Sequence, residues 1–184
     1  MIIGIGGVSN AGKTTLAKQL KEHLSGFSVS TLCQDDFPNP IDKIPKIRNH
    51  VDWEIPESID LSGFYKKMLS DTKEYDIVIA EGLFAFCNKK FVQHYDKKIF
   101  ITLTKDTFRK RKQKDLRWGK EPEWYMEHIW ESHFRCGTLT SFDENTMIIS
   151  GESTIDVNKI LDFLNLPKRS YPETNKNIPI LTNK

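Results

Sequence analysis

A complete phosphate-binding loop lies close to the start of the chain. Residues 7–14 read Gly-Val-Ser-Asn-Ala-Gly-Lys-Thr, which matches the G-x-x-x-x-G-K-[ST] motif. An apolar run at 2–5 precedes the loop, and a helical pattern follows it at 15–20. In this context a strand leads into a glycine turn, backbone N–H groups surround phosphate oxygens, and the next helix points its positive end at the anion. The sequence therefore predicts a nucleoside triphosphate site on an α/β fold.

The loop also predicts the ligands of the nucleotide and of Mg²⁺. Lys13 is expected to reach the β- and γ-phosphates, and the Thr14 hydroxyl is expected to ligate Mg²⁺. A second Mg²⁺ anchor is expected at Glu81, because it follows the apolar run 77–80 and ligands collect at the carboxyl ends of strands in open α/β sheets. An ordinary solvated loop glutamate is the alternative. The expected nucleotide-binding residues are Gly7, Ser9, Asn10, Ala11, Gly12, Lys13, Thr14 and Thr15.

Length and apolar patterning predict one α/β domain. The chain has 184 residues, which suits a single domain with a good core and is too short for two. Short apolar runs alternate with helical patterns, which predicts a five-stranded parallel sheet with helices on both faces. The expected strands are 2–5, 27–32, 77–80, 99–103 and 147–149, and the expected helices are 14–24, 58–70, 106–115, 122–136 and 155–164.

Two segments carry little periodicity. Four prolines fall between residues 38 and 56, which predicts a long irregular segment, and long loops in compact domains are often functional. After residue 166 the composition shifts to Pro, Asn, Lys and Thr. We expect one domain at 1–166 and a partly disordered, non-catalytic tail at 167–184, whose Ile178, Ile180 and Leu181 could dock on the body.

Charge is concentrated in one segment. The formal net charge is only +2, but residues 105–120 carry eight Lys or Arg against two Asp, a local charge of +6. By itself this pattern predicts a solvated basic helix, whereas next to a phosphate loop it predicts a helix that meets the nucleotide. Nucleic-acid binding is disfavoured, because only Phe108 and Trp118 are aromatic among these charges.

Cysteine spacing and hydropathy predict the compartment. Cys33, Cys87 and Cys136 have neither paired spacing nor a His partner at metal-ligand distance, so we expect reduced thiols. No run approaches eighteen apolar residues, and the start lacks a signal-peptide layout. We therefore expect a cytoplasmic protein without a membrane segment. The oligomeric state is left open.

A pair of carboxylates follows the second expected strand. Residues 34–37 read Gln-Asp-Asp-Phe and lie at the same sheet edge as the phosphate loop. Adjacent carboxylates there would repel a nucleotide unless they serve a metal or a proton transfer. In phosphoryl transfer to an alcohol, a carboxylate orients the hydroxyl and accepts its proton. Physical reasoning does not separate Asp35 from Asp36, and a turn pair is the alternative.

Together these segments resemble a known family. The loop 7–14, the run 34–37, the segment 53–60 (Trp-Glu-Ile-Pro-Glu-Ser-Ile-Asp), the turn 81–83 and the His128-x-Trp130 pair are similar to nicotinamide riboside kinases, in the uridine kinase-like branch of the P-loop kinases. The likeness covers most of residues 1–165. It implies ATP-dependent phosphorylation of the 5′-hydroxyl of a nucleoside on a five-stranded parallel core.

The resemblance assigns the acceptor-side residues. It makes Asp35 the catalytic base, with Asp36 and Phe37 beside the substrate. It places the ring of Trp53 against the base of the nucleoside and the next acid, Glu54, on the ribose hydroxyls. The family usually has Asp where this chain has Glu54, so neighbouring Asp52 is an alternative ribose ligand. A core position is the alternative for Trp53.

The resemblance also implies a mobile lid at about 105–136 that closes over ATP. Arg111 matches the lid arginine that stabilises the transferred phosphate, with Arg109 and Arg117 as companions, and Asp115 occupies a commonly basic position. The turn 150–154 is similar to the one beside the adenine, and a strand-to-helix loop with an N-cap is its alternative. His128 and Trp130 are either packing residues or substrate contacts.

The expected activity is conversion of nicotinamide riboside to nicotinamide mononucleotide, a step of NAD salvage, with ATP and Mg²⁺. A uridine or cytidine kinase would share nearly all of these residues and is the alternative. A nucleotide-dependent switch or ATPase is a third hypothesis, which the pair Asp35 and Asp36 disfavours because a switch needs no carboxylate to position an alcohol.

Overall fold

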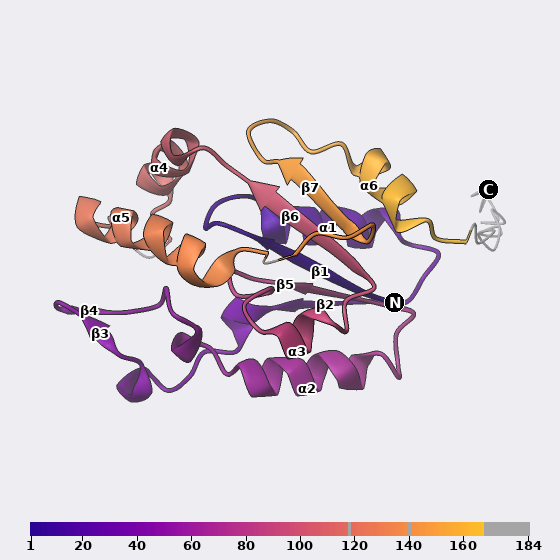
Figure 1. Ribbon diagram of the computed structural model, residues 1–184, viewed down its shortest axis with the longest axis horizontal. Helices are drawn as coiled ribbons and strands as arrows, with labels where there is room; N and C mark the ends of the chain where they lie inside the picture. Colours follow the sequence, from indigo (N-terminus) through magenta and orange to yellow (C-terminus); the bar gives the residue numbers. More distant parts are fainter. Residues whose placement is uncertain (118, 140, 168–184) are drawn as a thin grey trace, which may run out of the picture.

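A five-stranded parallel sheet forms the centre of this computed structural model, which describes residues 1–117, 119–139 and 141–167. The strand order is β2-β5-β1-β6-β7, so β1, which leads into the phosphate loop, lies in the middle of the sheet (Figure 1). Register pairs Ile3 with Ile79 of β5 and Ile5 with Ile99 of β6. The predicted fold class is confirmed. The central strands are β1 (Ile2–Gly7), β2 (Val29–Cys33), β5 (Ile77–Glu81), β6 (Lys97–Thr102) and β7 (Thr146–Ser150).

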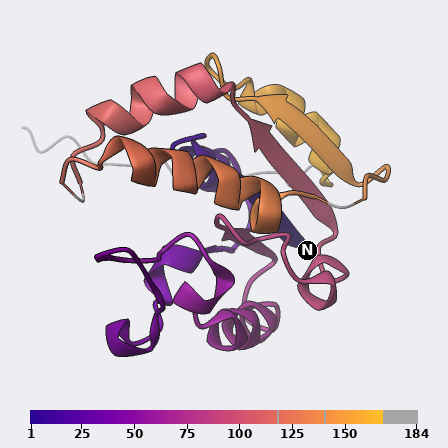
Figure 2. The same ribbon diagram turned by 60° about the vertical axis from the view of Figure 1, so that its left-hand side comes forward.

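Helices cover both faces of the sheet and extend beyond its carboxyl edge. In Figure 1, α1 and α6 lie on one side of the strands, and α2 and α3 lie on the other. Helices α4 and α5 lie side by side past the carboxyl ends of the strands, opposite the segment that carries β3 and β4 (Figures 1 and 2). The helices are α1 (Lys13–His23), α2 (Leu61–Asp71), α3 (Lys89–Val92), α4 (Lys105–Lys114), α5 (Glu123–Ser132) and α6 (Val157–Leu164).

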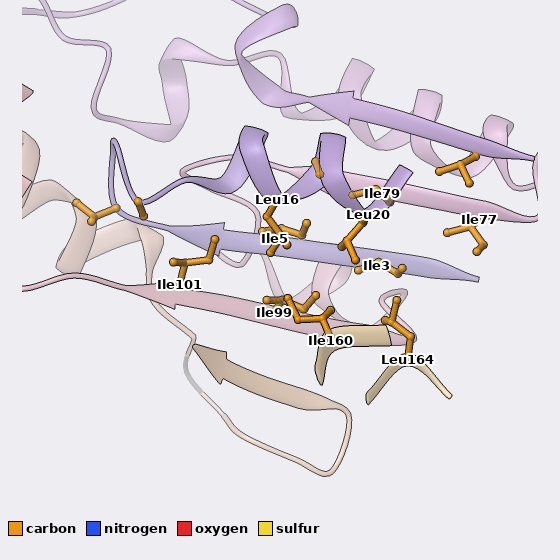
Figure 3. Packing of buried hydrophobic residues seen from close by; sticks show 14 of the residues in the cluster. Ile3, Ile5, Leu16, Leu20, Ile77, Ile79, Ile99, Ile101, Ile160 and Leu164 are labelled. Carbon is orange, nitrogen blue, oxygen red and sulfur yellow. The ribbon is translucent and has the colours of Figure 1, made fainter. Parts of the chain in front are cut away.

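Alternation along the strands builds two apolar layers. Successive strand side chains point to opposite faces, so the isoleucines of β1, β5 and β6 meet α1 and α6 on one face. Figure 3 shows Leu16 and Leu20 of α1 and Ile160 of α6 against these isoleucines, and all three are fully buried. On the other face, Phe64 and Met68 of α2 pack on Val78, Ala80 and Phe100. Burying one such side chain contributes about 1.5–3 kcal/mol, so this core fixes the sheet edge that carries the site.

Three segments differ from the expectations. The proline-rich segment 38–56 contains a short hairpin of β3 (Lys46–Ile47) and β4 (His50–Val51), turned at Arg48 with φ 53°. Two-residue strands are too short to leave a periodic signal. The expected helix at 122–136 is α5 followed by a π-helical turn, His133–Gly137, and the short helix α3 was not expected. Short 3-10 turns occupy Gln34–Asp36, Ile41–Lys43 and Pro56–Ser58.

The expected tail, 167–184, lies outside the described residues apart from Pro167, and so does Trp118. The docking of Ile178, Ile180 and Leu181 therefore stays a prediction. Among the described residues, no helix is both long enough and apolar enough to cross a membrane. Cys33, Cys87 and Cys136 are free thiols.

Candidate active site

The phosphate loop joins β1 to α1 through two glycines with positive φ. Gly7 has φ 146°, and a Cβ added there would lie 2.4 Å from the Ile101 carbonyl oxygen, so only glycine fits. Gly12 has φ 103° and is the N-cap of α1, where no side chain caps the helix. The first N–H groups of α1 are therefore left for an anion, as the sequence predicts. The Lys13 ammonium donates to the Val8 carbonyl at 3.1 Å inside the same loop.

Thr14 and Glu81 come together at the end of the central strands. The Thr14 hydroxyl donates to Glu81 Oε1 at 2.6 Å, and Glu81, the last residue of β5, is only 3% exposed. The solvated-loop alternative for Glu81 is thus wrong. Hydroxyl and carboxylate oxygens suit Mg²⁺, which usually keeps waters and phosphate oxygens as its other ligands. The two residues fit a Mg²⁺ site, although no group of three His, Cys, Asp or Glu in the described ranges could hold a metal.

The two adjacent aspartates lie in a 3-10 turn, Gln34–Asp36, directly after β2. Both side chains are exposed. Burial is the main cause that raises the pKa of Glu54, and the charge of Asp35 adds to it. The hydrogen bond to Asp115 is the main cause that raises the pKa of Arg117, and the charge of Asp35 again adds to it. The choice of Asp35 as the base stays a prediction.

The residues that flank the aspartates pack against the body of the protein. Gln34 is buried and accepts from the Phe84 backbone N–H at 2.9 Å, which fixes the loop after β5. The Phe37 ring meets Phe64 edge-on, with 5.4 Å between the centroids. Gln34 and Phe37 therefore anchor the turn, and a substrate contact of Phe37 stays a prediction.

Trp53 and Glu54 are adjacent, but their side chains have opposite environments. Trp53 is 41% exposed, so it is not a core aromatic. Glu54 is buried, and its Oε2 has no hydrogen-bond partner among the described residues. Burial raises the pKa of Glu54 to about 7, and the Lys112 ammonium opposes that rise. An unpaired buried acceptor is costly, which points to a ligand that supplies donors.

Asp52 is already engaged inside the protein. Its Oδ1 lies 2.8 Å from His128 Nε2 of α5 and accepts from the Glu54 backbone N–H at 3.1 Å. The Tyr125 hydroxyl accepts from the Trp53 N–H at 3.3 Å and donates to the Val51 carbonyl at 3.2 Å. Two side chains one turn apart on α5 therefore hold residues 51–53. His128 is a packing and positioning residue here, and Asp52 is occupied by these partners.

Helix α4 and the residue that follows it contact the phosphate loop through Arg111 and Asp115. Arg111 donates to the Asn10 carbonyl at 3.1 Å and to the Gly151 carbonyl at 2.6 Å. Asp115 Oδ2 accepts from Asn10 Nδ2 at 2.9 Å. Arg109 instead forms an ion pair with Glu123 of α5. The contact of Arg111 with a transferred phosphate stays a prediction.

The turn after β7 also packs on the phosphate loop, because a Cβ at Gly151 would lie 2.8 Å from the Ala11 carbonyl oxygen. Glu152 accepts from the Thr104 N–H at 2.6 Å. The turn 150–154 lies in the loop between β7 and α6, as its alternative predicted, and the N-cap of α6 is Asp156, two residues past the turn. A place beside the adenine stays a prediction. Trp130 packs on Phe108 and Phe134, as a packing residue does.

Three residues at the site were missed by sequence reasoning. Lys112 is 7% exposed, and its Nζ lies 3.7 Å from Glu121 Oε1. Its charge lowers the pKa of Glu54. Lys112 lies four residues after Phe108, on the same face of α4, and this helical spacing could have identified it. Tyr125 precedes His128 by three residues and could have been found in the same way. His133 is buried in the π-helical turn, and burial with the Lys13 charge lowers its pKa to about 4.

The sequence of the chain is similar to those of several kinases. No protein-family model matches the chain. It is 28% identical over 155 residues to "Nicotinamide riboside kinase 1" of Homo sapiens, covering 73% of this chain and 75% of that protein. It is 25% identical over 150 residues to "Nicotinamide riboside kinase 2" of Mus musculus, with 71% and 76% covered. It is 28% identical over 130 residues to "Uridine kinase" of Staphylococcus aureus (strain JH9), with 57% and 63% covered.

Solved structures show the same architecture. A sugar kinase from Janibacter sp. HTCC2649 has TM-score 0.57 at 14% identity, covering 89% of this chain and 94% of that one. The shikimate kinase of Aquifex aeolicus has TM-score 0.51 at 14% identity, with 90% and 96% covered. The chain has the fold of the P-loop kinases. Its sequence is similar to those of nicotinamide riboside and uridine kinases, as the sequence resemblance predicted.

Proposed function

We propose that the chain transfers the γ-phosphoryl group of ATP to the 5′-hydroxyl of a ribonucleoside, with nicotinamide riboside as the preferred substrate. The homologues named as nicotinamide riboside and uridine kinases support a nucleoside kinase. The product would be nicotinamide mononucleotide, which places the reaction in NAD salvage.

The observation that carries the proposal is the pair of Trp53 and Glu54. An exposed indole ring stands next to a buried carboxylate whose Oε2 has no partner among the described residues. The charges of Lys13 and Asp35 both affect the pKa of Glu54, so this carboxylate lies within electrostatic reach of the phosphate loop and of the candidate base. Ribose hydroxyls would supply the missing donors to Glu54, and the attached base would lie against Trp53.

The phosphate side of the site suits the same reaction. Lys13 and the N–H groups at the start of α1 would bind the triphosphate. Thr14 and Glu81 would hold Mg²⁺, which when bound neutralises charge on the phosphates. Asp35 would accept the proton of the 5′-hydroxyl as the new bond to phosphorus forms, and the exposure of Asp35 is consistent with that access.

A cationic base fits this pair better than a neutral one. Nicotinamide riboside carries a pyridinium cation, and a cation over an indole face gains roughly 0.5–2 kcal/mol. An ionised Glu54 adds electrostatic attraction and accepts charge-assisted hydrogen bonds. Uracil and cytosine are neutral and share only the stacking. Uridine and cytidine are the second candidate substrates, because the chain is also similar to a uridine kinase.

A panel of acceptors tests the proposal. ATP consumption would be measured with nicotinamide riboside, nicotinic acid riboside, uridine, cytidine and adenosine, at equal concentrations below saturation, and without any acceptor. The Lys13→Ala protein, purified in parallel, serves as the control for contaminating kinases. We expect the highest rate with nicotinamide riboside and formation of its 5′-phosphate. ATP hydrolysis that is independent of every nucleoside would instead identify a switch or ATPase.

A further inference from the structure

The peptide bond between Trp53 and Glu54 is held at both of its polar ends by side chains. The Trp53 carbonyl accepts from the Ser58 hydroxyl at 3.0 Å, and the Glu54 N–H donates to Asp52 Oδ1 at 3.1 Å. Ser58 is fully buried, and Asp52 is buried too. Because this carbonyl and this N–H belong to one planar group, the two contacts together fix its orientation. The peptide plane in turn sets the directions in which the Trp53 ring and the Glu54 carboxylate leave the backbone.

Asp52 is itself held by His128 of α5. Asp52 Oδ1 lies 2.8 Å from His128 Nε2, and only 10% of either side chain is exposed. A carboxylate only accepts hydrogen bonds, so His128 must donate from Nε2. An unpaired buried carboxylate would be costly, and the two donors at Oδ1 remove that cost. Asp52 therefore links α5 to the peptide between Trp53 and Glu54.

The β3–β4 hairpin is attached to α5 by further contacts that do not involve Asp52. The Arg48 guanidinium carbon lies 4.3 Å from the centroid of the Trp124 ring. His50 stacks on Tyr125, with 5.5 Å between the ring centroids. A variant that breaks the hydrogen bond from Asp52 to α5 should therefore leave the hairpin in place and disturb only the residues that directly follow it.

The Asp52 carboxylate also acts on Glu54 through its charge. Burial is the main cause that raises the pKa of Glu54 to about 7, and the charge of Asp52 adds to it. Removal of the Asp52 charge should lower the pKa of Glu54, because the nearby lysines would then be opposed by one carboxylate fewer. The other titratable groups that interact with Glu54 come from four elements: Lys13 of α1, Asp35 of the turn after β2, Lys112 of α4 and Tyr125 of α5.

We propose that Asp52 is a positioning residue of the acceptor end, which orients the peptide between Trp53 and Glu54 so that the ring meets the base and the carboxylate meets the ribose of one bound nucleoside. His128 holds Asp52 in place, and Ser58 fixes the other end of the same peptide. This inference rests on the proposed phosphorylation of a nucleoside. It adds to that proposal three residues that act without touching the substrate.

Two substitutions of Asp52 test its role as a hydrogen-bond acceptor. Asp52→Asn keeps an oxygen that accepts from the Glu54 N–H and from His128, whereas Asp52→Ala removes it. At a pH where Glu54 is ionised, Asp52→Ala should raise the KM for nicotinamide riboside by about tenfold, because a misplaced group loses part of its effect. Asp52→Asn should stay within about threefold of the wild type, and the KM for ATP should be unchanged in both. Equal losses in the two variants, or equal rises in both KM values, would overturn the inference.

The same comparison can be made on α5. Glutamine in His128→Gln keeps an N–H donor for Asp52 and should restore most of the nucleoside affinity that His128→Leu loses. The double variant of His128→Leu with Asp52→Ala should be no weaker than Asp52→Ala alone, because both remove one contact. His94→Leu, which removes a histidine hydrogen bond to Tyr65 of α2, is the control and should leave both KM values unchanged. Additive losses in the double variant, or no rescue by His128→Gln, would contradict the proposed pair.

A titration of the free protein separates this inference from the proposed function, because it needs no nucleoside. The indole N–H resonance of Trp53 would be followed by NMR across the neutral pH range in the wild type, Asp52→Asn and Glu54→Gln. We expect a midpoint of about 7 in the wild type, a lower midpoint in Asp52→Asn and no such titration in Glu54→Gln. Absence of nucleoside phosphorylation in the wild type would refute the proposed function and leave this titration intact. An unchanged midpoint in Asp52→Asn would show that Asp52 does not act on Glu54, and would overturn the inference.

Discussion

The phosphate end of the site, residues 7–15 with Glu81, and the acceptor end, Asp35 with residues 52–54, are built in different ways. Most groups of the phosphate end come from one continuous segment, and Glu81 is already hydrogen-bonded to Thr14. The acceptor end depends on distant contacts: the Trp53 N–H meets Tyr125, 72 residues away, and Asp52 meets His128, 76 residues away.

The two ends also differ in how completely their polar groups are satisfied. At the phosphate end, Thr14 and Glu81 satisfy each other before any ligand binds. At the acceptor end, Glu54 is buried with an unpartnered Oε2 and a pKa raised to about 7. A preformed phosphate end suits a donor common to many kinases, whereas an acceptor end with an unpaired carboxylate favours a ligand that completes it. Selectivity should therefore reside in residues 52–54.

The largest effect is expected at the phosphate end. Lys13→Ala should lower kcat by about a hundredfold or more, because it removes a preorganised charge next to the transferred phosphate. The melting temperature should hardly change, since Lys13 is not part of the apolar core. Lys18→Ala, an exposed lysine on the same helix, is the control and should leave kcat unchanged. A well-folded Lys13→Ala protein with wild-type turnover would end the kinase assignment.

The candidate base links the two ends, and Asp35→Asn tests it. The amide keeps the shape but cannot accept the hydroxyl proton, so the single-turnover rate should fall by about a hundredfold or more while ATP affinity is retained. Asp36→Asn, the adjacent exposed residue, is the matched control and should have a smaller effect. The opposite order of rates would move the base to Asp36.

Glu54→Gln addresses the unpaired carboxylate at the acceptor end. We expect the KM for the nucleoside to rise by about tenfold, since hydrogen bonds to a charged group contribute about 1.5–3 kcal/mol, and the KM for ATP to change little. In the wild type, nucleoside affinity should strengthen as the pH rises through about 7, where Glu54 ionises. The exposed Glu57→Gln is the control. A pH-independent nucleoside affinity in the wild type would contradict this role.

The same carboxylate predicts how stability depends on pH. The pKa of Glu54 is about 7 in the folded protein and 4.5 ordinarily, so the folded state binds more protons between these values. Its contribution to the free energy of unfolding should therefore fall as the pH rises from 4.5 to about 7. Chemical denaturation across this range should show a shallower fall for Glu54→Gln. Equal slopes for the two proteins would argue that Glu54 is not buried as described.

The smallest effect is expected at the contact between α5 and residues 51–53. Tyr125→Phe removes the hydroxyl that joins the Trp53 N–H and the Val51 carbonyl. A neutral hydrogen bond contributes about 0.5–1.5 kcal/mol, so the KM for the nucleoside should rise by about two- to tenfold at constant KM for ATP. Tyr75→Phe, on the surface, is the control. Equal changes in both KM values would indicate a general loss of structure instead.

The difference between the two ends also explains what the sequence could predict. The loop 7–14 and Glu81 were identified because a local motif and a strand end determine them, and the five apolar runs predicted the sheet. The occupation of Asp52 by His128 depends on how α5 packs against β4, which no local pattern records. Lys112 was not distinguished from the other basic residues of 105–120, because charge count does not reveal which face of α4 is buried. The β3–β4 hairpin was missed because its strands have two residues each.

Trp53→Ala tests the central claim most directly. The measured quantity is the ratio of kcat/KM for nicotinamide riboside to kcat/KM for uridine, in the wild type and in the variant. The account predicts a wild-type ratio above one, and a fall of about two- to thirtyfold in the variant, the size of a lost cation–π interaction of roughly 0.5–2 kcal/mol. A wild-type enzyme that prefers uridine or cytidine, or a ratio that Trp53→Ala leaves unchanged, would contradict it.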